Sequence, residues 1–416
     1  GVLEWNKAFE KIGFKDAIRV EQQPDDATWS THETGRASVR WFVDYNDGAL
    51  AVGPSRVDPR TGEILDADIT MGNGWVTLPR RRAEVQYPRP MPAANADSSE
   101  AVATWLPGGA ARTQASRLPR DLGGSDDAAF ELCSYGQSAI AEASFALDLL
   151  ALRGGEALDP KEAERIVHAT LKDVTTHEVG HTLGFRHNFR ASTIYTQAQI
   201  NDPAFTRANG IGGSVMDYNA FNVALDKEPQ GEYVMSTLGP YDYWAVEYAY
   251  KELPAAAESA ELQKIAARSS EPLLAYGTDE EIVGDLDGMD PEVNQRDVGG
   301  DPLEFARRRV QLSRELFDRL QARELKPGED YDILTRNFQS GLAQLGLAFE
   351  LAGKFVGGVV YRRDQAGSGR APLAPVAADK QRAALKLIND NLFAADGFNI
   401  KPEFASRLVD SALERG

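Results

Sequence analysis

Residues 177–187 read HEVGHTLGFRH and contain three of the five histidines in this 416-residue chain. His177 and His181 are four residues apart, so a helix would place both imidazoles on one face, within reach of a single metal ion. Glu178 directly follows the first histidine, where its carboxylate would stand beside the metal and accept a proton from metal-bound water. The spacing therefore predicts a zinc site on a helix, with a general base next to it.

The third histidine comes too late in the sequence to share that helical face. Gly184 can adopt a positive φ angle and turn the chain, which would bring His187 back to the same metal. Three histidines leave the fourth tetrahedral position of zinc open, as catalysis requires. Two alternatives remain: a structural helix whose histidines are buried without a metal, and a purely structural zinc site.

A helix that carries ligands needs a defined beginning. Asp159-Pro160-Lys161-Glu162 supplies an N-cap, a proline at the first helical position and a glutamate as capping-box partner. Apolar residues follow at helical spacing, which predicts one helix from about residue 160 to Gly184. His168 belongs to this helix but lies nine residues before His177, so we interpret it as structural and not as a ligand.

A second motif, Ser214-Val215-Met216-Asp217-Tyr218, lies downstream of the histidines. Alone it would indicate an ordinary turn, but together with HExxHxxGxxH it resembles the Met-turn of the metzincin zinc peptidases. The resemblance implies that Met216 forms an apolar floor beneath the three histidines. It also implies that Tyr218 is a further ligand or a hydrogen-bond donor to the transition state. A thioether suits that floor because it is apolar and adaptable.

The chain most closely resembles the large bacterial zinc-dependent metalloproteases with a Met-zincin domain, over nearly its whole length. Its pattern predicts a helix at 3–13, a strand at 39–43, and a turn followed by a second strand at 57–71. These segments resemble the upper subdomain of a metzincin, whose edge strand pairs with extended substrate. Residues 239–248 resemble the helix that closes the lower subdomain. Asn188 departs from the residues that often follow the third histidine, so no substrate preference is carried over.

The predicted fold is α+β. A metzincin-like catalytic domain, with a mixed twisted sheet, a long active-site helix and a Met-turn, would span residues 1–253 and include an insertion at about 79–125. A mainly α-helical C-terminal extension would span residues 254–416. Amphipathic stretches bounded by proline or glycine predict its helices, at 302–325, 331–355, 378–393 and 402–415. Two glycine segments, 357–358 and 367–369, predict turns between them.

The predicted insertion is rich in Pro, Ala, Arg and Gly and contains seven Arg and no Lys against four acidic residues. Long loops without periodicity are usually functional or disordered. It is either a solvated insertion or a flap that contacts substrate beside the cleft. Cys133 is the only cysteine, so no intramolecular disulfide is possible; we interpret it as a buried thiol in a helix at 126–153 and not as a cysteine switch.

A second metal is suggested by five aspartates in a glycine-rich segment. Oxygen-rich, turn-rich segments can bind calcium, but the spacing is not that of an EF-hand. The segment is therefore either a Ca²⁺ site or a solvated acidic loop. The aspartates are Asp285, Asp287, Asp290, Asp297 and Asp301.

Composition limits the partners. The chain has 45 Lys and Arg against 63 Asp and Glu, a formal net charge of −18, which argues against nucleic acid unless a basic patch is segregated. No run of 18 apolar residues predicts a membrane span, and no segment of the sequence is predicted to be a signal peptide. The start at Gly1 without an initiator methionine suggests a mature form or an excised fragment. The resemblance implies a periplasmic or secreted protein, and the sequence leaves the oligomeric state open.

The favoured hypothesis is a zinc metalloendopeptidase that hydrolyses peptide or protein substrates with zinc-activated water. His177, His181 and His187 would hold Zn²⁺, Glu178 would act as general base, and Tyr218 would assist the oxyanion. One alternative is a catalytically silent zinc-containing module that binds peptide or protein. Another is a zinc hydrolase that acts on a non-peptide amide. Glu178 favours an enzyme because a structural site has no use for a general base at that position.

Overall fold

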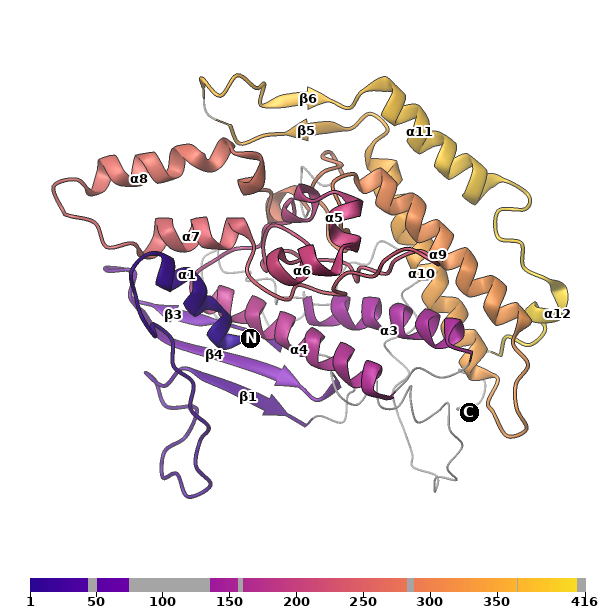
Figure 1. Ribbon diagram of the computed structural model, residues 1–416, viewed down its shortest axis with the longest axis horizontal. Helices are drawn as coiled ribbons and strands as arrows, with labels where there is room; N and C mark the ends of the chain where they lie inside the picture. Colours follow the sequence, from indigo (N-terminus) through magenta and orange to yellow (C-terminus); the bar gives the residue numbers. More distant parts are fainter. Residues whose placement is uncertain (44–50, 75–134, 156–159, 283–287, 365, 410–416) are drawn as a thin grey trace, which may run out of the picture.

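The computed structural model describes residues 1–43, 51–74, 135–155, 160–282, 288–364 and 366–409. Within these ranges the molecule combines a small mixed sheet with many helices, which confirms the predicted α+β class. Figure 1 shows the sheet beside helix α4 (Pro160–Thr182). The long helices α9 (Pro302–Ala322) and α10 (Asp332–Lys354) pack against α3 (Tyr135–Arg153).

The chain begins with a 3₁₀ turn, Val2–Trp5, followed by α1, Asn6–Lys11, which confirms the predicted N-terminal helix. Trp5 is fully buried, and its indole Nε1 donates a hydrogen bond to the carbonyl of Thr176 at 2.9 Å. The first helical segment is therefore fastened to the helix that carries the histidine motif.

The sheet is built around one long central strand. In chain order its strands are β1 Ser38–Phe42, β2 Ala51–Val52, β3 Ser55–Val57 and β4 Ile64–Gly72. β1 pairs with β4 in parallel, while β2 and β3 pair with the opposite edge of β4 in antiparallel orientation. The two predicted strands are confirmed, although Val43 lies outside β1 and is exposed. The pattern did not predict β2, which is only two residues long.

β2 and β3 together act as a single edge strand of the sheet. β2 and β3 are separated by Gly53 and Pro54, but both pair with β4 in the same register. Between them the amide of Asp68 donates to the carbonyl of Pro54 at 3.1 Å. Residues 51–57 therefore line β4 continuously, with a change of register only at Val57. The pairs in common register are Ala51–Met71, Val52–Thr70, Ser55–Ala67 and Arg56–Asp66.

Helix α4, Pro160–Thr182, confirms the predicted motif helix, and Gly184 follows it with φ of 86°. The predicted N-cap Asp159 lies outside the described residues. Glu162 accepts hydrogen bonds from Arg165 at 2.8 and 2.9 Å. Helix α3, Tyr135–Arg153, is the later part of the predicted helix at 126–153. Its first part, Cys133 and the insertion at 79–125 lie outside the described residues.

Short helices follow the histidine motif. They are a 3₁₀ turn at Ala191–Ile194, α5 Gln197–Asn201, α6 Pro203–Asn209, α7 Pro240–Tyr250 and α8 Glu258–Ala267. α7 confirms the helix predicted at 239–248. Three further 3₁₀ turns lead towards α9, at Arg268–Ser270, Pro272–Leu274 and Asp279–Glu281.

The C-terminal region is largely helical, as predicted. It contains α9 Pro302–Ala322, α10 Asp332–Lys354, α11 Ala378–Ile388 with a π-helical turn at Asn389–Phe393, and α12 Pro402–Ala405. The helix predicted at 402–415 is wrong for residues 406–409, where the amide of Val409 donates to the Thr335 hydroxyl and not to a helical carbonyl. Residues 410–415 lie outside the described residues. The pattern also missed a hairpin of β5 Val359–Tyr361 and β6 Leu373–Pro375. No helix in the described ranges is long and apolar enough to cross a membrane.

One hydrophobic cluster joins the N-terminal and C-terminal regions. It contains Trp5, Val174 and Met216 together with Val310 and Leu351 of the long C-terminal helices. The helical region is thus packed into the same core as the histidine helix. The domain boundary near residue 253 stays a prediction.

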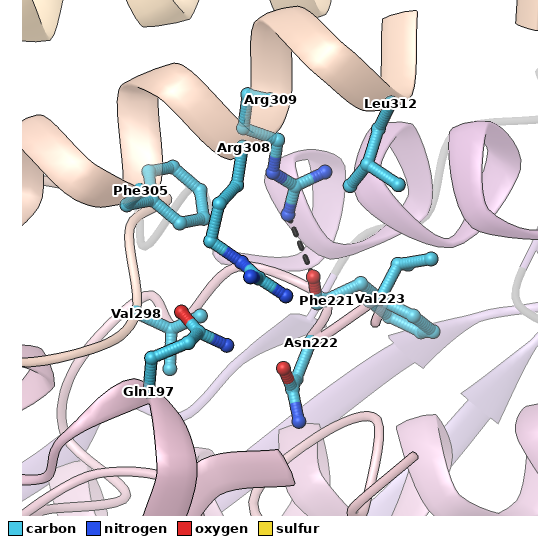
Figure 2. A pocket seen from close by; sticks show the side chains of 9 residues that line it. All are labelled: Gln197, Phe221, Asn222, Val223, Val298, Phe305, Arg308, Arg309 and Leu312. Atoms are coloured by element: carbon cyan, nitrogen blue, oxygen red, sulfur yellow. Dashed lines mark hydrogen bonds between the residues drawn. The ribbon is translucent and has the colours of Figure 1, made fainter. Parts of the chain in front are cut away.

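A buried ion pair reinforces this packing. Glu142 of α3 accepts a hydrogen bond from Arg309 of α9 at 2.8 Å, and each side chain is only 1% exposed. Gln344 of α10 donates to the same carboxylate at 2.7 Å. Arg309 also donates to the carbonyl of Phe221 at 2.6 Å, beside a small pocket between α9 and the segment after the Met-turn (Figure 2). The network ties α3, α9 and α10 to that segment.

We predict that Glu142→Ala lowers the free energy of unfolding by about 3–5 kcal/mol, because it leaves the Arg309 guanidinium buried without its counter-charge. Urea unfolding followed by circular dichroism measures the change. The control is Asp390→Ala, which removes an exposed pair with Lys386 and should cost about 0.5 kcal/mol or less. A similar small effect for both variants would show that the buried pair does not stabilise the fold.

Candidate metal centre

The three histidines of the motif lie together in the structure. One ring nitrogen from each of His177, His181 and His187 lies within 4.8 Å of the other two, and these residues form the only metal-ligand cluster of its kind among the described residues. The first two rings project from adjacent turns of α4, and the turn at Gly184 returns the third. The structure therefore brings together all three predicted ligands.

Each imidazole is oriented by a hydrogen bond at Nδ1. Two of the partners are backbone carbonyls and the third is a carboxylate, so all three can only accept. Nδ1 must therefore carry the proton and Nε2 the lone pair. The pairs are His177 with Val215 at 2.7 Å, His181 with Phe185 at 2.9 Å and His187 with Asp279 at 2.6 Å.

This arrangement fits a zinc ion. The Nε2 atoms of His181 and His187 are 3.1 Å apart, and two lone pairs so close repel each other unless a cation lies between them. Nitrogen ligands at tetrahedral positions on zinc lie about 3.3 Å apart, given bonds of about 2.0–2.1 Å. Burial holds the pKa of His177 well below its usual range, and burial with the neighbouring His187 lowers the pKa of His181 to about 4. Both rings are therefore neutral at pH 7, as ligation requires.

Glu178 is fully buried beside the first ligand, and the edge strand passes directly over it. A Cβ atom at Gly53 would lie 2.5 Å from the carbonyl oxygen of Glu178 and 3.1 Å from its Oε2. Only glycine allows this approach without displacement of the strand or the helix. No motif marks Gly53, because its contact joins a loop-like stretch to a helix more than a hundred residues away.

The predicted Met-turn packs beneath the histidine helix. Met216 is fully buried, and a Cβ atom at Gly180 would overlap its sulfur. Gly180 is the second variable position of HExxH, so the lack of a side chain there is what admits the thioether. The role of Met216 as a floor stays a prediction, but its placement is as expected.

The buried carboxylate of Asp242 on α7 holds the Met-turn in place. It accepts hydrogen bonds from the Ser214 hydroxyl at 2.6 Å, from the amide of Val215 at 3.0 Å and from the amide of Gly239 at 2.8 Å. Burial raises the pKa of Asp242 to about 7 despite these bonds. Asp242 binds the amide of Val215, and the carbonyl of Val215 orients His177. Asp242 therefore helps to position the first predicted metal ligand.

Two tyrosines pack against the imidazoles. The Tyr218 ring is buried, with its centroid 4.8 Å from that of His187 and 5.5 Å from that of His177. Tyr135 stacks on Tyr218 at 4.9 Å, and its hydroxyl donates to Asp173 at 2.7 Å. Tyr218 was predicted at the site, whereas Tyr135 was missed because it belongs to no motif.

Asp279 is the most informative residue that the sequence did not reveal. It lies 92 residues after His187, in the 3₁₀ turn at Asp279–Glu281. Partial burial alone would raise its pKa, but the hydrogen bonds from His187 and Thr278 and the nearby charge of Arg186 outweigh burial and lower the pKa of Asp279 to about 2. The Thr278 to Glu281 spacing is a capping box, which could have predicted the turn but not its partner.

Of the two alternatives for the aspartate-rich segment, the structure gives no support to a calcium site. Asp285 and Asp287 lie outside the described residues. Asp290 binds Arg190, Asp297 accepts from Asn294 at 3.0 Å, and Asp301 caps α9. His168 is exposed on α4 with its Nε2 3.8 Å from Glu164, in keeping with its interpretation as a residue outside the metal site.

Comparison with known families adds an independent finding. A family model described as Met-zincin matches residues 159–414, which is more than half of the chain and includes the three histidines and the Met-turn. Searches of curated proteins and of solved structures each found no match.

We predict that Gly180→Ala lowers the free energy of unfolding by about 1–3 kcal/mol, because the added methyl group overpacks the contact with Met216. Urea unfolding of the metal-free protein measures the effect. Gly346→Ala is the control: Gly346 lies in α10 with a negative φ and open space around its Cα, so the same change there should be neutral or stabilising. The close approach would be refuted by equal stability of the two variants.

Proposed function

Because this chain belongs to the Met-zincin family, we propose that it is a zinc-dependent endopeptidase. The observation that carries the proposal is the position of Glu178, between the histidine cluster and an open edge of the sheet. A structural metal site would place no buried carboxylate there. The proposal therefore favours an enzyme over a silent zinc-containing binding module.

The residues of the site divide the chemistry among them. His177, His181 and His187 would hold a zinc ion through Nε2. That ion, when bound, would supply Lewis acidity and lower the pKa of a water molecule toward about 7. Glu178 accepts the proton of the attacking water and delivers it to the leaving amine. Tyr218, whose ring packs beside His187, would donate a hydrogen bond to the developing oxyanion.

The edge strand at residues 51–57 supports a peptide as substrate. In an antiparallel ladder the polar groups of successive residues face opposite sides. The carbonyl of Pro54 faces β4, where it accepts from Asp68, so the N–H and C=O groups of Gly53 and Ser55 face away from the sheet. In the described ranges no strand pairs with this edge.

An extended peptide could add to this edge through main-chain hydrogen bonds. The missing N–H of Pro54 falls on the side that faces β4, so it takes no donor from the open edge. The edge also passes Glu178 at Gly53, which would bring a paired peptide bond to the general base. This geometry favours an extended peptide over a compact non-peptide amide.

We predict that Glu178→Gln retains one zinc per chain and loses about 10²–10⁴-fold in kcat, because the amide cannot accept the proton. Zinc content is measured by plasma mass spectrometry and cleavage with a quenched-peptide library, with and without chelator. Glu164→Gln on the exposed face of the same helix is the control and should leave kcat unchanged. Chelator-insensitive cleavage, or full activity of Glu178→Gln, would refute the mechanism; no cleavage by the zinc-loaded wild type would favour the silent module.

We predict that Gly53→Ala loses about 10²-fold in kcat/KM, because the methyl group must displace the edge strand or Glu178 by about 1 Å. Zinc content should stay at the wild-type value, since no ligand is touched. Arg56→Ala is the matched control, as Arg56 is an exposed residue of the same strand. Unchanged kcat/KM in Gly53→Ala would show that this edge does not bind substrate next to the general base.

A further inference from the structure

We propose that the region beyond residue 253 completes the metal centre: Asp279, on a loop held by Asn188, is the positioning residue for the third zinc ligand, His187. The proposal rests on the zinc site of the proposed function. It adds two residues that no motif marks. It also gives the mainly helical region beyond residue 253 a direct contact with the metal centre.

The contact of Asp279 with His187 differs from those of the other two ligands. His177 and His181 donate to backbone carbonyls, whereas His187 donates to a carboxylate at 2.6 Å. A carboxylate fixes the ring, its tautomer and its direction, and its charge makes the ligand nitrogen more basic. The third ligand needs this support most, because it lies after the turn at Gly184 and not on α4.

The Asp279 carboxylate is itself held in place. Its second oxygen accepts from the Thr278 hydroxyl at 3.1 Å and from Arg186 at 3.3 Å. Arg186 also donates to Glu280 at 2.9 Å. Arg186, which directly precedes His187, thus binds the same turn that His187 contacts. These contacts hold the Asp279 carboxylate in line with the imidazole of His187.

Asn188 fastens the loop that carries Asp279. Its amide nitrogen donates to the carbonyl of Ala275 at 3.0 Å, and its amide oxygen accepts from the backbone N–H of Gly277 at 3.2 Å. Its own backbone N–H donates to the carbonyl of Met216 at 2.9 Å. Asn188 therefore joins the loop to the Met-turn. This use explains why an amide follows the third histidine here, since a carboxylate could not donate to Ala275.

The far side of the loop is anchored by Glu281. Its side chain is 2% exposed, accepts from the backbone N–H of Thr278 at 2.9 Å and binds Arg363 just after β5. The loop is thus tied to the histidine motif on one side and to the C-terminal hairpin on the other. A chain that ended at residue 253 would lack Asp279, the loop that Asn188 holds and the ion pair of Glu281 with Arg363.

The test is the zinc affinity of the full-length chain, measured by competition with a chromophoric chelator. Asp279→Ala should weaken zinc binding about 10–100-fold, as is typical when the partner of a ligand histidine is removed. Asp279→Asn keeps an acceptor without charge and should fall between Asp279→Ala and wild type. Glu280→Gln is the matched control, because it removes a neighbouring charge that also binds Arg186 but does not touch His187; its affinity should stay within about twofold of wild type.

Asn188→Asp provides a second, independent variant. It should weaken zinc binding because it breaks the bond to Ala275, and its effect should not add to that of Asp279→Ala, since both act through one contact. Circular dichroism of the metal-free proteins checks that each variant is folded. If Asp279→Ala does not fold, the comparison of Asp279→Asn with Glu280→Gln decides.

Equal zinc affinities of the Asp279 variants and Glu280→Gln would overturn the proposal, as would fully additive effects of Asn188→Asp and Asp279→Ala. The readout is metal binding and not hydrolysis, so the two proposals fail separately. A wild-type chain that binds zinc but cleaves no peptide would refute the endopeptidase and leave the role of Asp279 standing. If the wild type cleaves peptides but the Asp279 variants bind zinc with unchanged affinity, the role of Asp279 is refuted and the endopeptidase proposal stands.

Discussion

The hydrogen bonds at the three Nδ1 atoms are the constraint on which the metal centre depends. A histidine can present Nε2 to a metal in many directions, and only a fixed acceptor on the opposite nitrogen selects one. The acceptors belong to three different places in the chain: the turn after α4, the Met-turn, and the loop at 275–281. Much of the surrounding structure fixes the positions of these three acceptors, which are the carbonyls of Phe185 and Val215 and the carboxylate of Asp279.

Close packing between elements serves the same end. Gly180 lets the Met216 sulfur approach the helix between two ligands, and Gly53 lets the edge strand approach Glu178. In both places the lack of a side chain on glycine allows a close contact, with the Met216 sulfur in one case and with Glu178 in the other. The buried Asp242 then fixes the Met-turn from the side of α7. The site is thus a layered arrangement of strand, helix, turn and second helix.

Local patterns predicted much of this structure from the sequence. The spacing of His177 and His181 and the glycine after them were enough for α4 and its ligands, because helical periodicity needs only neighbouring residues. Met216 and Tyr218 followed from the resemblance to a family. Asp279 could not be predicted, because its contact with His187 spans 92 residues and depends on the packing of loops that carry no periodic signal.

The sheet illustrates the same limit. β4 lies within the strand that was predicted after a turn at 57–71. Residues 51–57 were not predicted as a strand, because a proline and a glycine interrupt the pattern and only pairing with β4 makes that stretch a strand. The C-terminal helices were predicted as separate amphipathic stretches. Their burial in one core with Trp5 and Met216 depends on contacts such as that of Arg309 with Glu142, which link distant helices.

The distance of Asp279 from the histidines along the chain has a consequence for biosynthesis. A ribosome adds about 5–20 residues per second, so the 92 residues that separate His187 from Asp279 take about 5–18 s to appear. During that interval the nascent chain already contains its three imidazoles, but the partner of the third has not been made. If Asp279 positions His187 as proposed, we expect the metal centre to be complete only after the loop at 275–281 has been translated and has docked.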